Sequence, residues 1–121
     1  MSFLKNFLNS FRYALRGVWC ILLTERNMRV HFFAAIVVIA FGIYFNISPA
    51  EWCIVALCIG MVMAAEVFNS ALESLTDLVK PEQHPVAGKV KDAAAGAVLL
   101  TALAAAVVGI LVFWKYFFPA S

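Results

Sequence analysis

The sequence predicts an all-α integral membrane protein in which an N-terminal surface helix precedes three transmembrane helices. Of its 121 residues, 64% are hydrophobic and 13% are charged, whereas soluble domains have about 45–50% apolar and about 25% charged residues. Long uncharged segments recur along the chain, and the N-terminal stretch is amphipathic. This composition argues against a soluble enzyme and against disorder. The net charge of +2 is too small to suggest a nucleic-acid partner.

The first predicted element is a surface helix at about residues 3–23. Lys5, Arg12 and Arg16 fall on the face opposite the apolar residues, and they argue against a cleaved signal peptide. A helix of this kind lies in the plane of the lipid headgroups. The apolar stripe at helical spacing comprises Leu4, Phe7, Leu8, Phe11, Leu15, Val18, Trp19 and Leu22.

Three apolar segments then predict transmembrane helices, each of which needs about 20 mostly apolar residues. Residues 32–50 and 93–114 are uncharged runs of this length. The predicted spans are residues 30–47, 51–79 and 91–116.

The middle span carries a carboxylate into the membrane. Its uncharged run, residues 52–65, reaches only about 21 Å at about 1.5 Å per residue, which is short of the ~30 Å hydrocarbon core. The helix must therefore continue through Glu66 to about Leu72 or beyond. The three cysteines lie in apolar runs without a CxxC pair, and we expect them to be small buried hydrophobic residues.

The placement of basic residues predicts the orientation. The loop between the first two spans has no Lys or Arg, so the positive-inside rule puts the N-terminus and the 80–91 loop in the cytoplasm and the C-terminus outside. The basic residues on the cytoplasmic side are Lys5, Arg12, Arg16, Arg26, Arg29, Lys80, Lys89 and Lys91.

The polar residues of the middle span form a stripe. Offsets of three, four and seven put Glu66, Asn69, Ser70 and Glu73 on one helix face, and Asp77 extends it. Such residues cannot face lipid, so they must meet protein, water or a cation.

Glu25, before the first span, and Lys91-Asp92, opening the third, are expected at the same level. Carboxylates one helical turn apart suit Mg²⁺, a carboxylate in apolar surroundings can act as a general base, and a lysine can neutralise phosphate. These parts fit Mg²⁺-assisted phosphoryl transfer at the bilayer surface. A proton or ion path, or polar contacts between subunits, fits them equally well. The chain has neither a P-loop nor a Gly-rich kinase loop.

The run Glu66 to Glu73 (EVFNSALE), followed by Asp77, His84 and Lys91-Asp92, closely resembles the small integral-membrane lipid kinases of bacteria. These are the prokaryotic diacylglycerol kinases and their undecaprenol kinase relatives. The resemblance extends from about Tyr13 into the third span. It implies a single membrane lipid-kinase domain over residues 1–121, a homotrimer with active sites between subunits, a place in the bacterial inner membrane, and ATP with Mg²⁺.

The resemblance also implies roles for individual residues. Glu66 matches the catalytic base, and Asn69 matches an amide that places the reacting groups beside it. Glu25 and Glu73 match the acids that hold Mg²⁺ on the ATP phosphates. The remaining nucleotide-binding matches are Tyr13, Glu82, Gln83, His84, Lys91 and Asp92.

The lipid acceptor is the open question. His31, where diacylglycerol-type members carry an acid, and the His84-Pro85 pair favour undecaprenol, with diacylglycerol as the alternative. A small proton or cation transport subunit is a more remote alternative, because the other two spans have few polar residues to form a relay. No role is assigned to His31 or Asp77.

Overall fold

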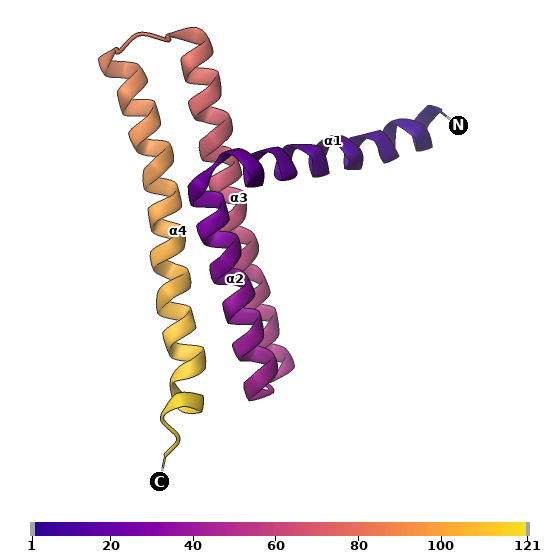
Figure 1. Ribbon diagram of the computed structural model, residues 1–121, viewed down its shortest axis with the longest axis vertical. Coiled ribbons are helices and arrows are strands. Elements are labelled where there is room, and N and C mark those ends of the chain that lie inside the picture. Colours follow the sequence, from indigo (N-terminus) through magenta and orange to yellow (C-terminus); the bar gives the residue numbers. More distant parts are fainter. Residues whose placement is uncertain (1, 121) are drawn as a thin grey trace.

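The structure is a computed structural model that describes residues 2–120, and over that range it consists of four helices (Figure 1). Three of them are long and apolar enough to cross a membrane. The prediction of an all-helical chain with three apolar spans is therefore confirmed. The helices are α1 (Ser2–Thr24), α2 (Arg26–Phe45), α3 (Pro49–Val79) and α4 (Pro85–Phe117).

The three apolar helices lie side by side, and α1 projects away from the side of this bundle (Figure 1). The most extensive contact is between α3 and α4, and α2 packs against α3. The α3–α4 hairpin continues beyond the junction of α1 and α2 (Figure 1). With 31 residues, α3 is about 46 Å long at about 1.5 Å per residue. It therefore exceeds the ~30 Å hydrocarbon core by about ten residues.

The junction between α1 and α2 fixes the direction in which α1 leaves the bundle. Glu25 has an extended backbone (φ −104°, ψ 120°) and interrupts the two helices. The guanidinium of Arg29 donates a hydrogen bond of 2.8 Å to the carbonyl of Leu23. This bond satisfies one of the carbonyls that a helix end leaves without a partner. Met28, in the first turn of α2, is completely buried.

The turn between α2 and α3 combines a left-handed residue with a capping box. Asn46 ends α2 with φ 53°, a conformation that asparagine tolerates. The Ser48 hydroxyl accepts from the Glu51 N–H at 3.2 Å, and the Glu51 carboxylate accepts from the Ser48 N–H at 2.9 Å. Gly42 admits the ring of Trp52, since a Cβ at position 42 would lie 2.6 Å from that ring.

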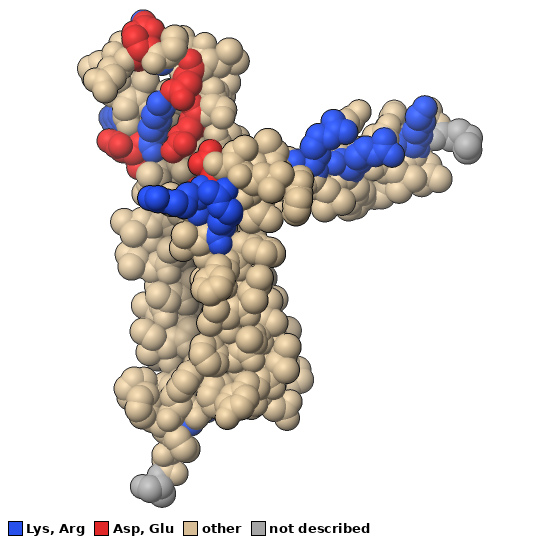
Figure 2. Space-filling view, viewed as in Figure 1, with Lys and Arg blue, Asp and Glu red and all other residues tan. Residues whose placement is uncertain are grey.

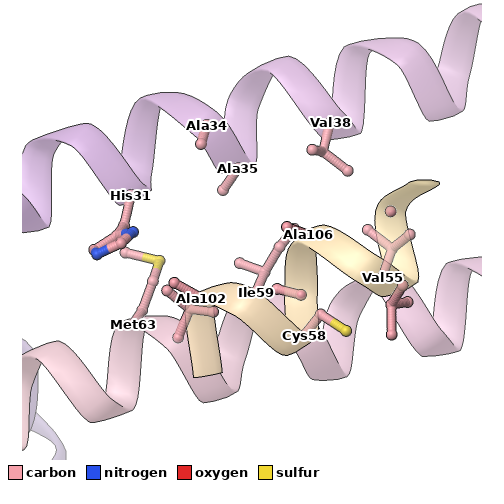
Figure 3. Close-up of a pocket in the computed structure, with 14 residues that line it drawn as sticks. His31, Ala34, Ala35, Val38, Val55, Cys58, Ile59, Met63, Ala102 and Ala106 are labelled. Atoms are coloured by element: carbon pink, nitrogen blue, oxygen red, sulfur yellow. The ribbon is translucent and has the colours of Figure 1, made fainter. Parts of the chain in front are cut away.

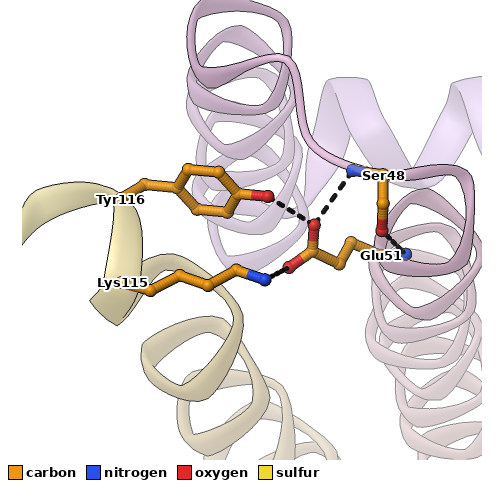
Figure 4. Close-up of polar contacts among 4 residues, drawn as sticks. All are labelled: Ser48, Glu51, Lys115 and Tyr116. Atoms are coloured by element: carbon orange, nitrogen blue, oxygen red, sulfur yellow. Dashed lines mark hydrogen bonds and ion pairs between the residues drawn. The ribbon is translucent and has the colours of Figure 1, made fainter. Parts of the chain in front are cut away.

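Glu51 also joins the start of α3 to the end of α4 (Figure 4). Its carboxylate accepts a hydrogen bond of 2.6 Å from the Tyr116 hydroxyl and lies 3.2 Å from the Lys115 ammonium. We call the set Ser48, Glu51, Lys115 and Tyr116 the clasp. Beside it lies the hydrophobic core cluster, which comprises Ile47, Val55, Val112 and Phe113.

The expectation that the cysteines are buried is wrong for two of the three. Cys20 and Cys53 are exposed on the surface of the chain, and Cys58 is half-buried. The physical reason is that a membrane helix turns much of its apolar surface outward, so an apolar run does not imply burial within the chain.

Candidate active site

Three buried polar residues follow one another on the inner face of α3. Glu66 is 1% exposed, Asn69 6% and Ser70 2%. Within the described part of the chain, Glu66 Oε2, Asn69 Oδ1 and Ser70 Oγ are buried without a hydrogen-bond partner. A buried polar atom without a partner costs free energy. The stripe is therefore suited to a group that this single chain does not supply, such as a substrate or a second subunit.

The surroundings of Glu66 contain most of the predicted acid and amide residues. The Asn69 amide donates a hydrogen bond of 3.3 Å to the Glu73 carboxylate. Glu25 and Glu73 both lie near enough to interact electrostatically with Glu66. His31 Nε2 lies 3.8 Å from Glu66 Oε2. The structure thus brings together Glu66, Asn69, Glu73 and Glu25, and it adds His31, which the sequence reading left without a role.

The donor atoms near Glu66 fit Mg²⁺ only in part. No group of three or more His, Cys, Asp and Glu side chains within residues 2–120 could hold a metal ion by itself. Mg²⁺ is typically held by one or two carboxylates and completes its octahedron with water and substrate phosphates. Glu73, with the unpartnered Asn69 oxygen beside it, would supply only part of such a shell. A polyphosphate must supply the rest.

The loop end of the α3–α4 hairpin, where α3 and α4 are joined, carries most of the acidic residues. Figure 2 shows acidic side chains gathered there, and basic side chains along α1 and around the α1–α2 junction. Lys91 of α4 forms an ion pair with Asp77 of α3. Asp77, to which the sequence assigned no role, lies about one helical turn beyond Glu73 and pairs with the predicted phosphate partner. Asp92 is exposed.

The hairpin loop borders an open hollow of about 540 Å³. His84 is the N-cap of α4, where its Nδ1 accepts a hydrogen bond of 3.1 Å from the Val86 N–H. The pKa of Glu82 lies below its ordinary value because its own backbone N–H and the Lys80 ammonium hydrogen-bond to the carboxylate. The hollow is lined by Lys80, Pro81, Glu82, Gln83, His84, Pro85, Ala87, Gly88 and Lys91.

Tyr13, a predicted nucleotide-binding residue, does not line this hollow. It is 62% exposed on α1, and the Arg16 guanidinium lies 5.8 Å from the centre of its ring. Because α1 projects away from the bundle, Tyr13 and the hairpin loop belong to different parts of the molecule (Figure 1).

An apolar groove of about 250 Å³ runs between α2, α3 and α4. The walls of the groove on α2 and α4 are mostly alanines, whose small side chains leave this space unfilled. His31 projects from α2 towards Met63 at one end of the groove (Figure 3). The groove therefore reaches the imidazole that lies beside Glu66.

The chain is a helical membrane protein with three apolar spans. Its buried polar stripe on α3 lies next to an apolar groove. The chain belongs to the prokaryotic diacylglycerol kinase family. The sequence profile of that family, described as "Prokaryotic diacylglycerol kinase", matches residues 12–113. The predicted resemblance is confirmed, and the protein is a membrane lipid kinase.

Individual relatives carry two different names. The chain is 41% identical to an undecaprenol kinase of Bacillus subtilis over 110 residues, covering 91% of this chain and 89% of that protein. It is 44% identical to a diacylglycerol kinase of Synechocystis sp. over 105 residues, covering 86% of this chain but only 60% of that protein. It is 23% identical to the diacylglycerol kinase of Escherichia coli over 105 residues, with 87% of this chain and 86% of that protein covered.

Proposed function

We propose that this lipid kinase transfers the γ-phosphate of ATP to the hydroxyl of undecaprenol and so forms undecaprenyl phosphate. The observation that carries the proposal is the buried Glu66 carboxylate, which lies 3.8 Å from His31, a residue that lines an apolar groove. The similarity of this chain to the undecaprenol kinase of Bacillus subtilis, over most of both chains, supports undecaprenol as the acceptor. Diacylglycerol is the second candidate acceptor, and the Synechocystis relative supports it.

Glu66 is proposed as the general base. It accepts the proton of the lipid hydroxyl while that oxygen bonds to the γ-phosphorus and the bond to the ADP oxygen breaks. The products are the lipid phosphate, ADP and protonated Glu66. Asn69, within the same turn of α3, is proposed to place the reacting groups.

Glu25 and Glu73 are proposed to hold Mg²⁺ with the ATP phosphates; when bound, the ion would neutralise charge on the transferring group. Lys91 is the proposed phosphate partner. Glu82 keeps its charge, so it suits hydroxyl or amino groups of the nucleotide better than phosphate. The other proposed nucleotide contacts are Tyr13, Gln83, His84 and Asp92.

The apolar groove is proposed to receive the part of the lipid chain nearest the hydroxyl. A lipid whose hydroxyl lies at Glu66 can extend directly into this groove, because His31 lines the groove and also lies 3.8 Å from Glu66. The lining is otherwise almost wholly apolar, which suits a hydrocarbon chain.

The active form is proposed to be a homotrimer in the bacterial inner membrane. Two features support shared sites: Tyr13 is separated from the hairpin loop, and the α3 stripe retains buried atoms without partners. We propose that α1 lies flat on the cytoplasmic surface, with the N-terminus and the hairpin on that side and the C-terminus outside. The basic residues along α1 and at its junction with α2 support this orientation (Figure 2).

The experiment is a phosphate-transfer assay on the purified protein in detergent micelles, with Mg²⁺-ATP and either undecaprenol or diacylglycerol. We expect faster transfer to undecaprenol and a fall of about 10²- to 10⁴-fold in Glu66→Gln. Glu51→Gln is the matched control, because it makes the same change in the first turn of α3, away from Glu66. Since Glu51 belongs to the clasp, its rate is compared per amount of folded protein. Faster transfer to diacylglycerol would support the second acceptor. No transfer to either lipid by folded protein, or full activity in Glu66→Gln, would overturn the proposal.

A further inference from the structure

His31 is the imidazole closest to the buried carboxylate of α3. It lies in the second turn of α2, its side chain is 20% exposed, and the Glu66 side chain is 2% exposed. The atom nearest to its Nε2 on that carboxylate, Oε2 at 3.8 Å, is the one that is buried without a hydrogen-bond partner.

The other groups around Glu66 do not supply this partner. The Asn69 amide donates to Glu73. Glu25 and Glu73 are carboxylates, and an ionised carboxylate accepts hydrogen bonds but has none to donate to Oε2. His31 is the neighbour whose ring nitrogen is paired with Oε2 itself, at 3.8 Å, and it can donate a hydrogen bond to that atom.

The distance of 3.8 Å is longer than a charge-assisted hydrogen bond, which measures about 2.7–2.9 Å. An adjustment of about 1 Å, within the reach of side-chain rotation, closes it. Catalytic hydrogen bonds are often long without substrate and shorten when the substrate is bound.

We propose that His31 is a positioning residue for Glu66: its Nε2–H donates to Oε2 and leaves the other carboxylate oxygen for the proton of the lipid hydroxyl. His31 does not itself touch the transferred phosphate. The inference deepens the proposed function and rests on it, because it assigns to His31 the orientation of the proposed base.

Kinetics of two His31 variants test this role. Glutamine can keep an N–H donor near the position of Nε2, whereas leucine has no donor and a comparable bulk. We expect His31→Leu to lower kcat for the lipid by about 10- to 100-fold, since a misplaced base loses about that much rate. The KM for ATP stays unchanged, and His31→Gln recovers most of the lost kcat. Phe33→Leu, a neighbouring substitution at a position 68% exposed on the same helix, is the control and keeps its kcat.

A double-mutant cycle separates positioning from a general effect on the fold. Because His31 acts through Glu66, we expect His31→Leu to lower the residual rate of Glu66→Gln by less than about threefold. An equal fold-loss in both backgrounds would overturn the proposal. So would an unchanged kcat in His31→Leu, or a loss that His31→Gln does not recover.

An NMR measurement tests the pair without any enzymatic activity. In protein labelled with ¹⁵N-histidine in micelles, we expect Glu66→Gln to shift the imidazole signals of His31 and to leave those of His84 in place. If the His31 signals do not respond, the pairing is wrong even when the kinase activity is confirmed. If they respond but no lipid is phosphorylated, the pairing holds and the proposed function fails.

Discussion

Replacing glycine by alanine is expected to have opposite effects on stability at positions 42 and 60. Both glycines lie inside apolar helices, Gly42 in α2 and Gly60 in α3. A Cβ at position 42 would lie 2.6 Å and 2.9 Å from two ring carbons of Trp52 and 3.2 Å from the Ile47 side chain. A Cβ at position 60 would meet nothing within 4 Å.

The magnitude follows from these distances. Carbon atoms in ordinary van der Waals contact are at least about 3.5 Å apart. Gly42→Ala therefore forces the Trp52 ring to move by nearly 1 Å. Overpacking of this kind costs about 1–3 kcal/mol, and the better helix propensity of alanine returns about 1 kcal/mol. We expect a net loss of about 1 kcal/mol for Gly42→Ala. Gly60→Ala has only the propensity gain, so its free energy of unfolding rises by up to about 1 kcal/mol.

The assay is unfolding of the purified protein in mixed micelles by increasing SDS, followed by Trp fluorescence and circular dichroism. Both variants keep the wild-type kcat, because neither glycine belongs to the proposed site. Equal stability changes in the two variants, or a stabilising Gly42→Ala, would refute the packing described for the α2–α3 turn.

Three further predictions concern the groove, the metal and the clasp. Ala106→Trp fills the apolar groove and raises the KM for the lipid by about tenfold without changing the KM for ATP; an unchanged lipid KM would remove the groove from the substrate path. Glu73→Gln raises the Mg²⁺ concentration for half-maximal rate by about tenfold or more, and a Mg²⁺ titration of the rate that matches the wild type would contradict its role. Tyr116→Phe removes the hydroxyl that donates to Glu51 and lowers the SDS midpoint, whereas Tyr44→Phe, at a position 79% exposed, does not; equal midpoints for the two variants would count against the clasp.

The spans and the polar stripe were predictable from the sequence because both are local patterns. The length of an apolar run sets a membrane helix. The spacing of Glu66, Asn69 and Glu73 on one helix sets their common face without any knowledge of packing. The topology then brings Glu25 to the same level.

The contacts between helices were not predictable in this way. The pairs of His31 with Glu66, Lys91 with Asp77, and Tyr116 with Glu51 each join two helices. Such pairs depend on the register and rotation of one helix against another, which no local spacing encodes. The Ser48-x-x-Glu51 pattern was a usable signal for the start of α3, but it gave no indication that Glu51 also reaches α4.

Because α3 is continuous between the clasp and Glu66, it fixes the distance between them across the bilayer. The 15 residues that separate Glu51 from Glu66 set a height of about 22 Å. The bilayer can thin or thicken around this length, but the helix cannot change it. Lipids with shorter or longer acyl chains therefore change the depth of Glu66 below the headgroups. We expect the reaction rate to depend on bilayer thickness for this reason.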